Sequence, residues 1–169
     1  GLNENHINNK NHIKLARDVA AKSIVLLKNK NNILPLSKNI NRLFITGPNA
    51  ANVNTLLANY NGLSPNMVTP LEGITTKVSN GTMIRFNEGV GLISDNNRMD
   101  WSASLAGSSD VTIAIMGISA LIEGEEGAAI SSDANGDRNT ISLPTNQIEY
   151  LRKLRKSAGD KPIVLVIKS

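Results

Sequence analysis

The fold class can be inferred from one apolar run, Val111-Thr112-Ile113-Ala114-Ile115-Met116, which is followed by Gly117. These six residues are almost all apolar and lack the alternation of a strand with one face in solvent. Such a run is typical of a strand in a parallel sheet that helices cover on both faces. Three further short runs have the same character: Leu43–Thr46, Thr82–Phe86 and Ile163–Ile167.

Predicted helices separate these strands. Apolar residues that recur every three or four positions predict a helix over His12–Lys28. At Thr69, an N-cap residue precedes Pro at the first helical position and Glu in the first turn. Other helices are expected over Asn52–Asn59, Met99–Leu105 and Leu143–Lys156. Alternating helices and strands predict an α/β fold, a doubly wound, mostly parallel sheet with helices on both faces.

The length of the chain fits one such domain. A chain of 169 residues can bury a substantial core. We expect residues 1–11 to form a polar linker and residues 12–169 to form an α/β domain. Four strands make a small doubly wound sheet, and Ser169 follows the last strand directly. We therefore expect the domain to be incomplete at its C-terminal end.

Composition argues against several classes of protein. The chain has no Cys, and its two His residues, His6 and His12, lie near the polar N-terminus, so we expect no metal site and no cofactor. No apolar run approaches the ~20 residues that span a bilayer, and the polar residues 1–12 do not have the pattern of a signal peptide, so we expect any export signal to lie outside this chain. The net charge of +4 comes from Lys and Arg spread along helices, and aromatics make up 3% of the residues. This pattern does not predict nucleic-acid binding.

The segment from Gly117 to Arg138 is the best candidate for chemistry. Ligands of open α/β sheets bind outside the carboxyl ends of the strands, and this segment follows one. Crowded carboxyl groups raise one another's pKa, as a general acid requires. Composition alone, however, favours an inert acidic surface loop with Asp137 and Arg138 as a local tether. The acids of the segment are Glu123, Glu125, Glu126, Asp133 and Asp137.

Two other ligands have weaker support. The acids of this segment do not follow the spacing of a helix–loop–helix calcium site. The turn Gly47–Ala50 lies between a strand and a helix, where a nucleotide phosphate could bind. It lacks the glycine pattern and the Lys of a phosphate loop, and Pro48 removes one backbone donor.

Nine motifs in order resemble the C-terminal α/β domain of glycoside hydrolase family 3 enzymes of the β-glucosidase and β-xylosidase type. The resemblance covers the chain from His12 onward. The motifs are HIKLARDVAAKSIVLLKNKNNILPL, LFITGPNA, ANYNG, TPLEGI, SDVTIAIMG, EGEEG, GDRNTISLP, NQIEYL and KPIVLVIKS.

The resemblance implies a retaining β-glycosidase that cleaves β-glycosides or oligosaccharides. Enzymes of this family carry the nucleophile Asp on a preceding (β/α)8-type barrel domain and the acid/base Glu on the present domain. The acid/base position falls on Glu123, with Glu125 and Glu126 as alternatives. Because the nucleophile lies on the barrel domain, the chain is expected to be inactive alone.

The resemblance also assigns secondary roles. Asn59 and Tyr60 match a segment near the domain interface or the substrate rim, and Asp137 and Arg138 match an ion pair that fixes the base of the loop. A periplasmic or secreted protein is compatible with the family, although the chain itself indicates no compartment. Two alternatives stay open: a non-catalytic sugar-binding or assembly module of the same fold, and a nucleotide-binding α/β domain.

Overall fold

The computed structural model describes residues 3–57, 64, 66–93, 99–123 and 140–168. The chain divides into two compact units, residues 1–36 and 37–169, which are treated separately below. The predicted boundary, with a linker over residues 1–11 and an α/β domain over residues 12–169, stays a prediction.

The first unit consists of one α-helix and two short 3-10 helices. Its elements are η1 (Glu4–His6), α1 (Lys10–Ser23) and η2 (Lys30–Asn32). The side chain of Asn9 caps α1 by accepting the backbone N–H groups of Asn11 and His12, both at 3.0 Å. The expected continuation of this helix to Lys28 is wrong, because the backbone is already extended at Ile24. Two β-branched residues in a row, Ile24 and Val25, disfavour a further turn, and neither is buried to compensate.

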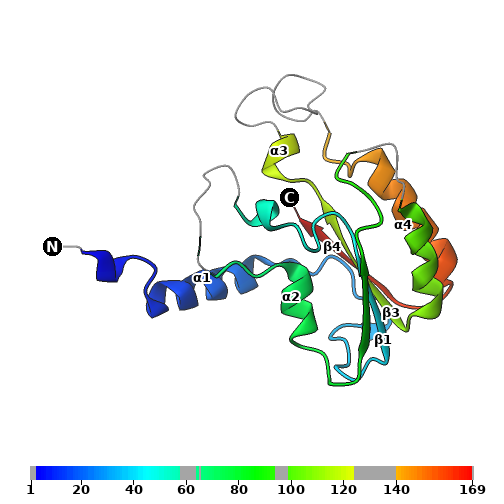
Figure 1. Cartoon of the computed structure of the whole chain (residues 1–169), viewed down its shortest axis with the longest axis horizontal. Helices are drawn as coiled ribbons and strands as arrows, with labels where there is room; N and C mark the ends of the chain where they lie inside the picture. Colours follow the sequence, from blue (N-terminus) through cyan, green and yellow to red (C-terminus); the bar gives the residue numbers. More distant parts are fainter. Residues whose placement is uncertain (1–2, 58–63, 65, 94–98, 124–139, 169) are drawn as a thin grey trace. The chain divides into compact units, whose positions relative to one another are not determined.

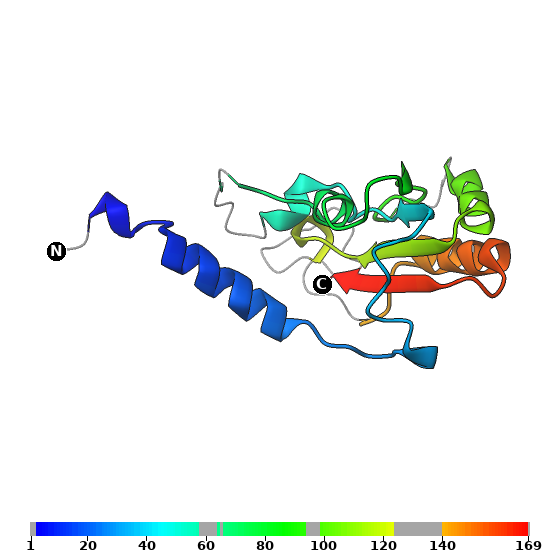
Figure 2. The same ribbon diagram turned by 90° about the horizontal axis from the view of Figure 1, so that it is seen from below.

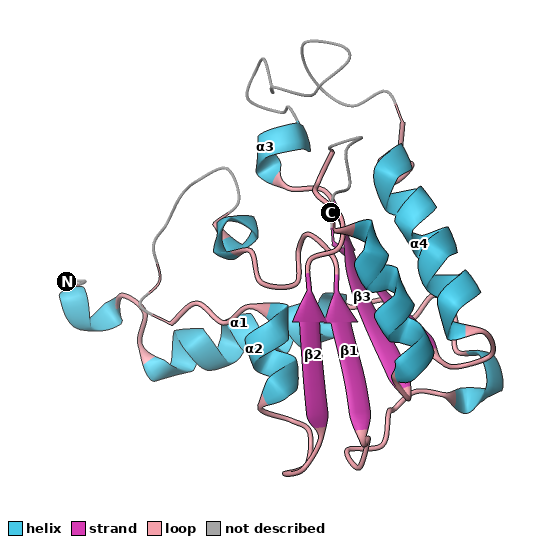
Figure 3. Ribbon diagram, turned by 45° about the vertical axis from the view of Figure 1, so that its right-hand side comes forward, coloured by secondary structure: helices cyan, strands magenta, loops and turns pink. Residues whose placement is uncertain are grey.

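The second unit is built on a four-stranded sheet in which all strands are parallel. The strand order is β2-β1-β3-β4, so the chain moves first to one side of β1 and then to the other. Figure 3 shows the strands pointing the same way, with α3 beyond their carboxyl ends. The bounds are β1 Arg42–Thr46, β2 Met83–Asn87, β3 Val111–Gly117 and β4 Ile163–Lys168. Each agrees with its predicted run to within one residue.

Helices cover both faces of the sheet. Figure 1 views the sheet nearly edge-on and shows α2 on one side and α4 on the other. This arrangement confirms the doubly wound α/β fold. The helical elements are η3 (Val53–Leu56), α2 (Pro70–Thr75), η4 (Asp100–Ser108), α3 (Ala120–Glu123) and α4 (Thr145–Ala158).

Two of these helices show how local sequence sets their form. At α2, the predicted helix start at Thr69 is confirmed, and the structure adds a capping box, in which the side chains of Thr69 and Glu72 each accept the other residue's backbone N–H. The helix expected near residue 100 is instead the 3-10 helix η4. Its small residues Ala103 and Ala106, three positions apart, are buried, which suits a turn of three residues that lies close to α4.

Burial separates the central strands from the edge strands. Every residue of β3 is buried, as the apolar run predicts, and all of β1 except Arg42 is buried. The same expectation fails for β4, where the three consecutive residues Leu165–Ile167 are exposed. Within the described sheet, β2 and β4 each have only one neighbouring strand, so less of their surface is covered. Figure 2 shows β4 beside β3 and in front of α4.

Candidate functional site

The carboxyl ends of the strands meet at one edge of the sheet, where the chain leaves each strand. The backbone N–H of Gly47, after β1, donates to the carbonyl of Glu88, after β2, at 3.0 Å. The N–H of Ile118, after β3, donates to the carbonyl of Lys168 in β4 at 3.1 Å. These bonds continue the parallel ladder by one step, so the segments that follow the strands start from fixed positions.

Glycine is required where the chain turns away from β1 and β3. Gly47 has φ +112°, and a Cβ there would lie 2.1 Å from the carbonyl oxygen of Ile115. Gly117 has φ +130°, and a Cβ there would lie 1.7 Å from the carbonyl oxygen of Lys168. Side chains are excluded on both steric and conformational grounds. The two turns therefore bring the backbone unusually close to the neighbouring strands.

Glu123 lies at this edge, on the short helix that follows β3. Only Ile118 and Ser119 separate the end of β3 from α3. The backbone N–H of Glu123 donates to the carbonyl of Ser119 at 3.0 Å, which holds Glu123 one turn from the strand end. The residue is half-buried, whereas Ile122 beside it is buried and anchors α3.

The other predicted site residues lie outside the described part of the chain. These residues are Asn59, Tyr60, Glu125, Glu126, Asp137 and Arg138. Their assignments, as substrate-rim residues, as alternative acid/base groups and as a loop ion pair, stay predictions.

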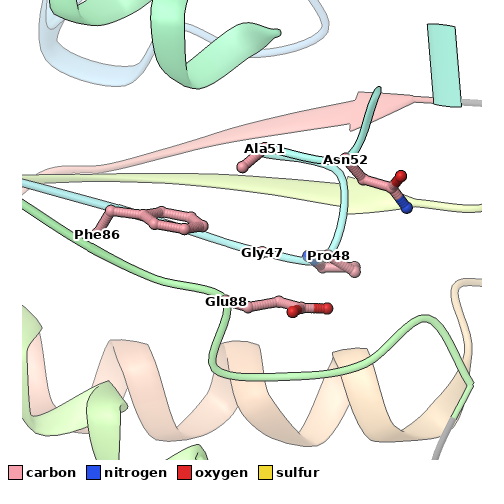
Figure 4. A pocket seen from close by; sticks show the side chains of 6 residues that line it. All are labelled: Gly47, Pro48, Ala51, Asn52, Phe86 and Glu88. Carbon is pink, nitrogen blue, oxygen red and sulfur yellow. The ribbon is translucent and has the colours of Figure 1, made fainter. Parts of the chain in front are cut away.

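A shallow pocket of about 290 Å³ opens beside the turn after β1. Figure 4 shows the Phe86 ring at one end of it and the Glu88 carboxylate near Pro48 at the other. Burial raises the pKa of Glu88 above its ordinary value. Burial also lowers the pKa of Lys168, at the end of β4. Both shifts have one cause: partial burial removes water from the two charged groups and so disfavours their charged forms.

A buried amide that sequence reasoning missed links two of the segments at this edge. Gln147, in the first turn of α4, accepts the N–H of Gly117 at 2.9 Å and donates to the Gly117 carbonyl at 2.8 Å. It also donates to the carbonyl of Leu92 at 2.9 Å. A signal was present in the sequence, since Gln147 has the same helical spacing as the buried Tyr150, Leu154 and Ala158.

Two buried polar atoms near the same turns have no hydrogen-bond partner among the described residues: Oδ1 of Asn49 and Oγ of Ser119. The other amide atom of Asn49, Nδ2, donates to the carbonyl of Ile118 at 3.4 Å. Asn49 thus contacts the link between β3 and α3, in which Ser119 is buried and Ile118 is half-buried.

The turn after β1 is a poor phosphate cradle. The N–H groups of Gly47, Asn49 and Ala50 already donate to backbone carbonyls, and Pro48 has none to offer. These contacts support a structural role for the turn over nucleotide binding. Within residues 3–57, 64, 66–93, 99–123 and 140–168, no group of three His, Asp or Glu residues is placed to hold a metal ion. No helix in those ranges is both long and apolar enough to cross a membrane.

Comparison with known proteins places the chain among glycosidase domains. The "Probable beta-D-xylosidase 7" of Arabidopsis thaliana is 34% identical over 168 residues, which are 98% of this chain and 20% of that protein. The exo-1,4-beta-xylosidase xlnD of Aspergillus niger is 34% identical over 159 residues, which are 90% of this chain and 18% of that protein. The chain thus spans about a fifth of the length of these relatives.

A solved structure has the same fold. A family 3 exo-beta-xylosidase (XlnD), in complex with a xylobiose aziridine activity-based probe, matches with a TM-score of 0.74 and 31% identity. That match covers 92% of this chain and 18% of the solved one. Residues 24–169 match the family described as the glycosyl hydrolase family 3 C-terminal domain. Because this match covers the whole sheet and all its crossover helices, the chain belongs to the C-terminal domain family of glycosyl hydrolase family 3.

Proposed function

We propose that this chain is the second domain of a retaining β-glycosidase and that Glu123 is its general acid/base. The observation that carries the proposal is the position of Glu123. It lies one helical turn beyond the carboxyl end of the fully buried strand β3, on the edge of the sheet where α/β proteins bind ligands. The relatives named as β-xylosidases support a β-linked xylose unit as the substrate, and the family resemblance adds a β-linked glucose unit as the alternative.

The chemistry needs a second carboxylate from a partner domain. In the first step, a nucleophilic carboxylate attacks the anomeric carbon while Glu123 gives its proton to the leaving oxygen. In the second step, Glu123 takes a proton from water as that water attacks the covalent intermediate. We assign the nucleophile to a (β/α)8-type barrel domain that precedes this one in a longer protein, as the family resemblance implies.

The test exploits the dependence of acid catalysis on the leaving group. In the protein that joins this domain to its barrel, Glu123→Gln removes the proton donor and keeps the side-chain size. We expect kcat/KM for a xyloside or glucoside with a poor alkyl leaving group to fall by about 10²–10⁴-fold. A dinitrophenyl glycoside, whose leaving group needs no proton, should keep most of its kcat/KM.

Three control variants make the result specific. Glu125→Gln and Glu126→Gln test the alternative assignments, and the variant that reproduces the leaving-group effect identifies the acid. Glu149→Gln removes a carboxylate from the exposed face of α4 and should change neither substrate's kcat/KM. If Glu123→Gln cleaves both substrates at the wild-type rate, the assignment is wrong.

The absence of activity in the isolated chain is a separate part of the proposal. A lone general acid contributes only about 10²–10⁴-fold, which is far below what glycoside hydrolysis requires. We expect the purified chain to release no sugar from either substrate. Turnover by the chain alone would show that it also holds a nucleophile.

A further inference from the structure

The side chain of Gln147 is fully buried, and three of its four hydrogen-bonding positions meet backbone groups at the carboxyl edge of the sheet. Its exposed fraction is 0%. Its Oε1 accepts from one N–H, and its Nε2 donates to two carbonyls, at distances between 2.8 and 2.9 Å. A buried amide that meets so many partners at good geometry is strongly held, since each lost bond would leave a buried polar group unsatisfied.

These contacts join two segments that the sheet itself does not join. Gly117 ends β3, and Leu92 follows β2, but β1 lies between these two strands. The neighbouring residue of α4, Asn146, extends the link by donating its Nδ2 to the carbonyl of Gly91 at 2.9 Å. The first turn of α4 therefore clamps the segments that leave β2 and β3.

Gly117 is the point from which Glu123 is positioned. Gln147 bonds both polar atoms of Gly117, N–H and carbonyl, so the peptide units on either side of that residue cannot rotate freely. The next residue, Ile118, is fixed by its bond to Lys168, and Ser119 accepts the N–H of Glu123. Hydrogen bonds at Gly117, Ile118 and Ser119, joined by the covalent backbone, thus connect Gln147 to the backbone of Glu123.

We infer that Gln147 is a positioning residue for the acid/base carboxyl of Glu123. The inference rests on the proposed function. The hydrogen bonds of the Gln147 side chain go to Gly117 and Leu92, so it acts on Glu123 through the orientation of Gly117. Displacement of a catalytic group by about 1 Å costs on the order of 10²-fold in rate. Loss of the amide should therefore weaken proton donation selectively and leave the rest of the reaction in place.

Two substitutions in the barrel-bearing protein test this role. Gln147→Met keeps the length of the side chain and removes the hydrogen bonds. Gln147→Glu keeps an acceptor for the Gly117 N–H, but its carboxylate faces two carbonyl oxygens and cannot donate to them. When protonated, the same carboxyl can donate to one carbonyl, so lower pH should partly restore its function relative to wild type. Tyr150→Phe is the matched control, since it also removes buried hydrogen bonds from α4 but touches neither Gly117 nor Leu92.

The readout is the ratio of kcat/KM for an alkyl glycoside to kcat/KM for a dinitrophenyl glycoside. A purely structural role would lower both values together and leave the ratio unchanged. We expect Gln147→Met to lower the ratio by about 10–100-fold. We expect Gln147→Glu to lower the ratio by a similar factor at neutral pH. At about pH 5 the decrease should be smaller, because this pH is nearer the range in which carboxyl groups take up a proton. Tyr150→Phe should keep the wild-type ratio, and circular dichroism confirms which variants are folded.

The outcomes separate the two proposals. If Glu123→Gln itself leaves the ratio unchanged, the proposed function fails, whatever Gln147 does. If Glu123→Gln lowers the ratio but folded Gln147 variants keep it, the positioning role is overturned. The positioning role is also overturned if Tyr150→Phe lowers the ratio as much as the Gln147 variants do. Should Gln147→Met fail to fold, the pH dependence of Gln147→Glu decides alone, and a ratio that matches wild type at every pH refutes the inference.

Discussion

The hydroxyl of Tyr150 offers the most direct test of the packing between α4 and the sheet. Tyr150 is 0% exposed, and its hydroxyl is hydrogen-bonded to the hydroxyls of Thr46 at 2.9 Å and Ser102 at 2.8 Å. Thr46 donates to the carbonyl of Glu88, so it accepts from Tyr150, which in turn accepts from Ser102. Tyr150→Phe removes the central member of this chain and leaves the ring in place.

The expected cost follows from the two lost bonds. Each buried hydrogen bond contributes about 1 kcal/mol net, and its loss leaves a hydroxyl unsatisfied. The free energy of unfolding should therefore fall by about 2 kcal/mol. With a typical urea dependence of about 2 kcal/mol per molar, the unfolding midpoint should fall by about 1 M. Far-ultraviolet circular dichroism in a urea series measures this shift directly.

A double-mutant cycle with Ser102→Ala tests the mechanism. Ser102→Ala alone removes one of the bonds and should cost about 1 kcal/mol. In the Tyr150→Phe background it should cost less, because its partner is already absent. If Tyr150→Phe leaves the urea midpoint unchanged, or if the two costs simply add, the hydroxyl chain does not stabilise the fold as argued.

The same side chain predicts a pH effect. Burial raises the pKa of the Tyr150 hydroxyl above its ordinary value. The unfolded chain therefore releases this proton from about pH 10 upward, while the folded chain still holds it. Wild-type stability should fall in that range, and Tyr150→Phe, which has no such proton, escapes this loss. The difference in free energy of unfolding between wild type and Tyr150→Phe should narrow above about pH 10. A difference that stays constant with pH would contradict the burial of the hydroxyl.

Two further predictions concern the turn after β3 and the start of β1. Gly117→Ala places a Cβ 1.7 Å from the Lys168 carbonyl oxygen and should lower the free energy of unfolding by at least about 3 kcal/mol. Gly81 also has a positive φ, but a Cβ there would meet open space. Gly81→Ala should therefore lower the free energy of unfolding distinctly less in the same urea assay. Hydrogen bonds from Arg42 lower the pKa of the Asp110 carboxyl, so its stabilisation is present above its ordinary pKa of about 3.9 and is lost as pH falls through the lowered value. Asp110→Asn should therefore be less stable than wild type at about pH 7 and equal to it in strong acid, and a deficit that persists at low pH would point to a cause other than this ion pair.

The sequence determined those features whose causes lie within a few residues. The start of α2 depends only on its own first turn, and Thr69 caps it as predicted, with Pro70 at the first helical position. The apolar run of β3 has no charged residue to place in water, so a buried central strand was its natural outcome. The position of Glu123 at the carboxyl end of β3 followed from the same run, because chain order fixes what comes next.

Features that depend on neighbours could not be foreseen in the same way. The predicted helix to Lys28 continued an apolar stripe, yet α1 ends at Ser23. The prediction failed because periodicity shows which residues share a helix face but does not show whether anything buries that face. The similar apolar run of β4 predicted a buried strand, but Leu165–Ile167 are exposed. Position in the sheet decided this point, since β4 has one strand beside it and β3 has two.

Sequence alone therefore determined the family, the alternation of helices and strands, and the candidate acid at Glu123. Which polar side chains are buried and hydrogen-bonded became clear from the three-dimensional arrangement of the chain. Gln147 bonds residues 30 and 55 positions away, and the Tyr150 hydroxyl bonds one residue 104 positions away. A buried hydrogen bond depends on where distant backbone and side-chain atoms meet, and that information exists only once the sheet has brought the ends of its strands together.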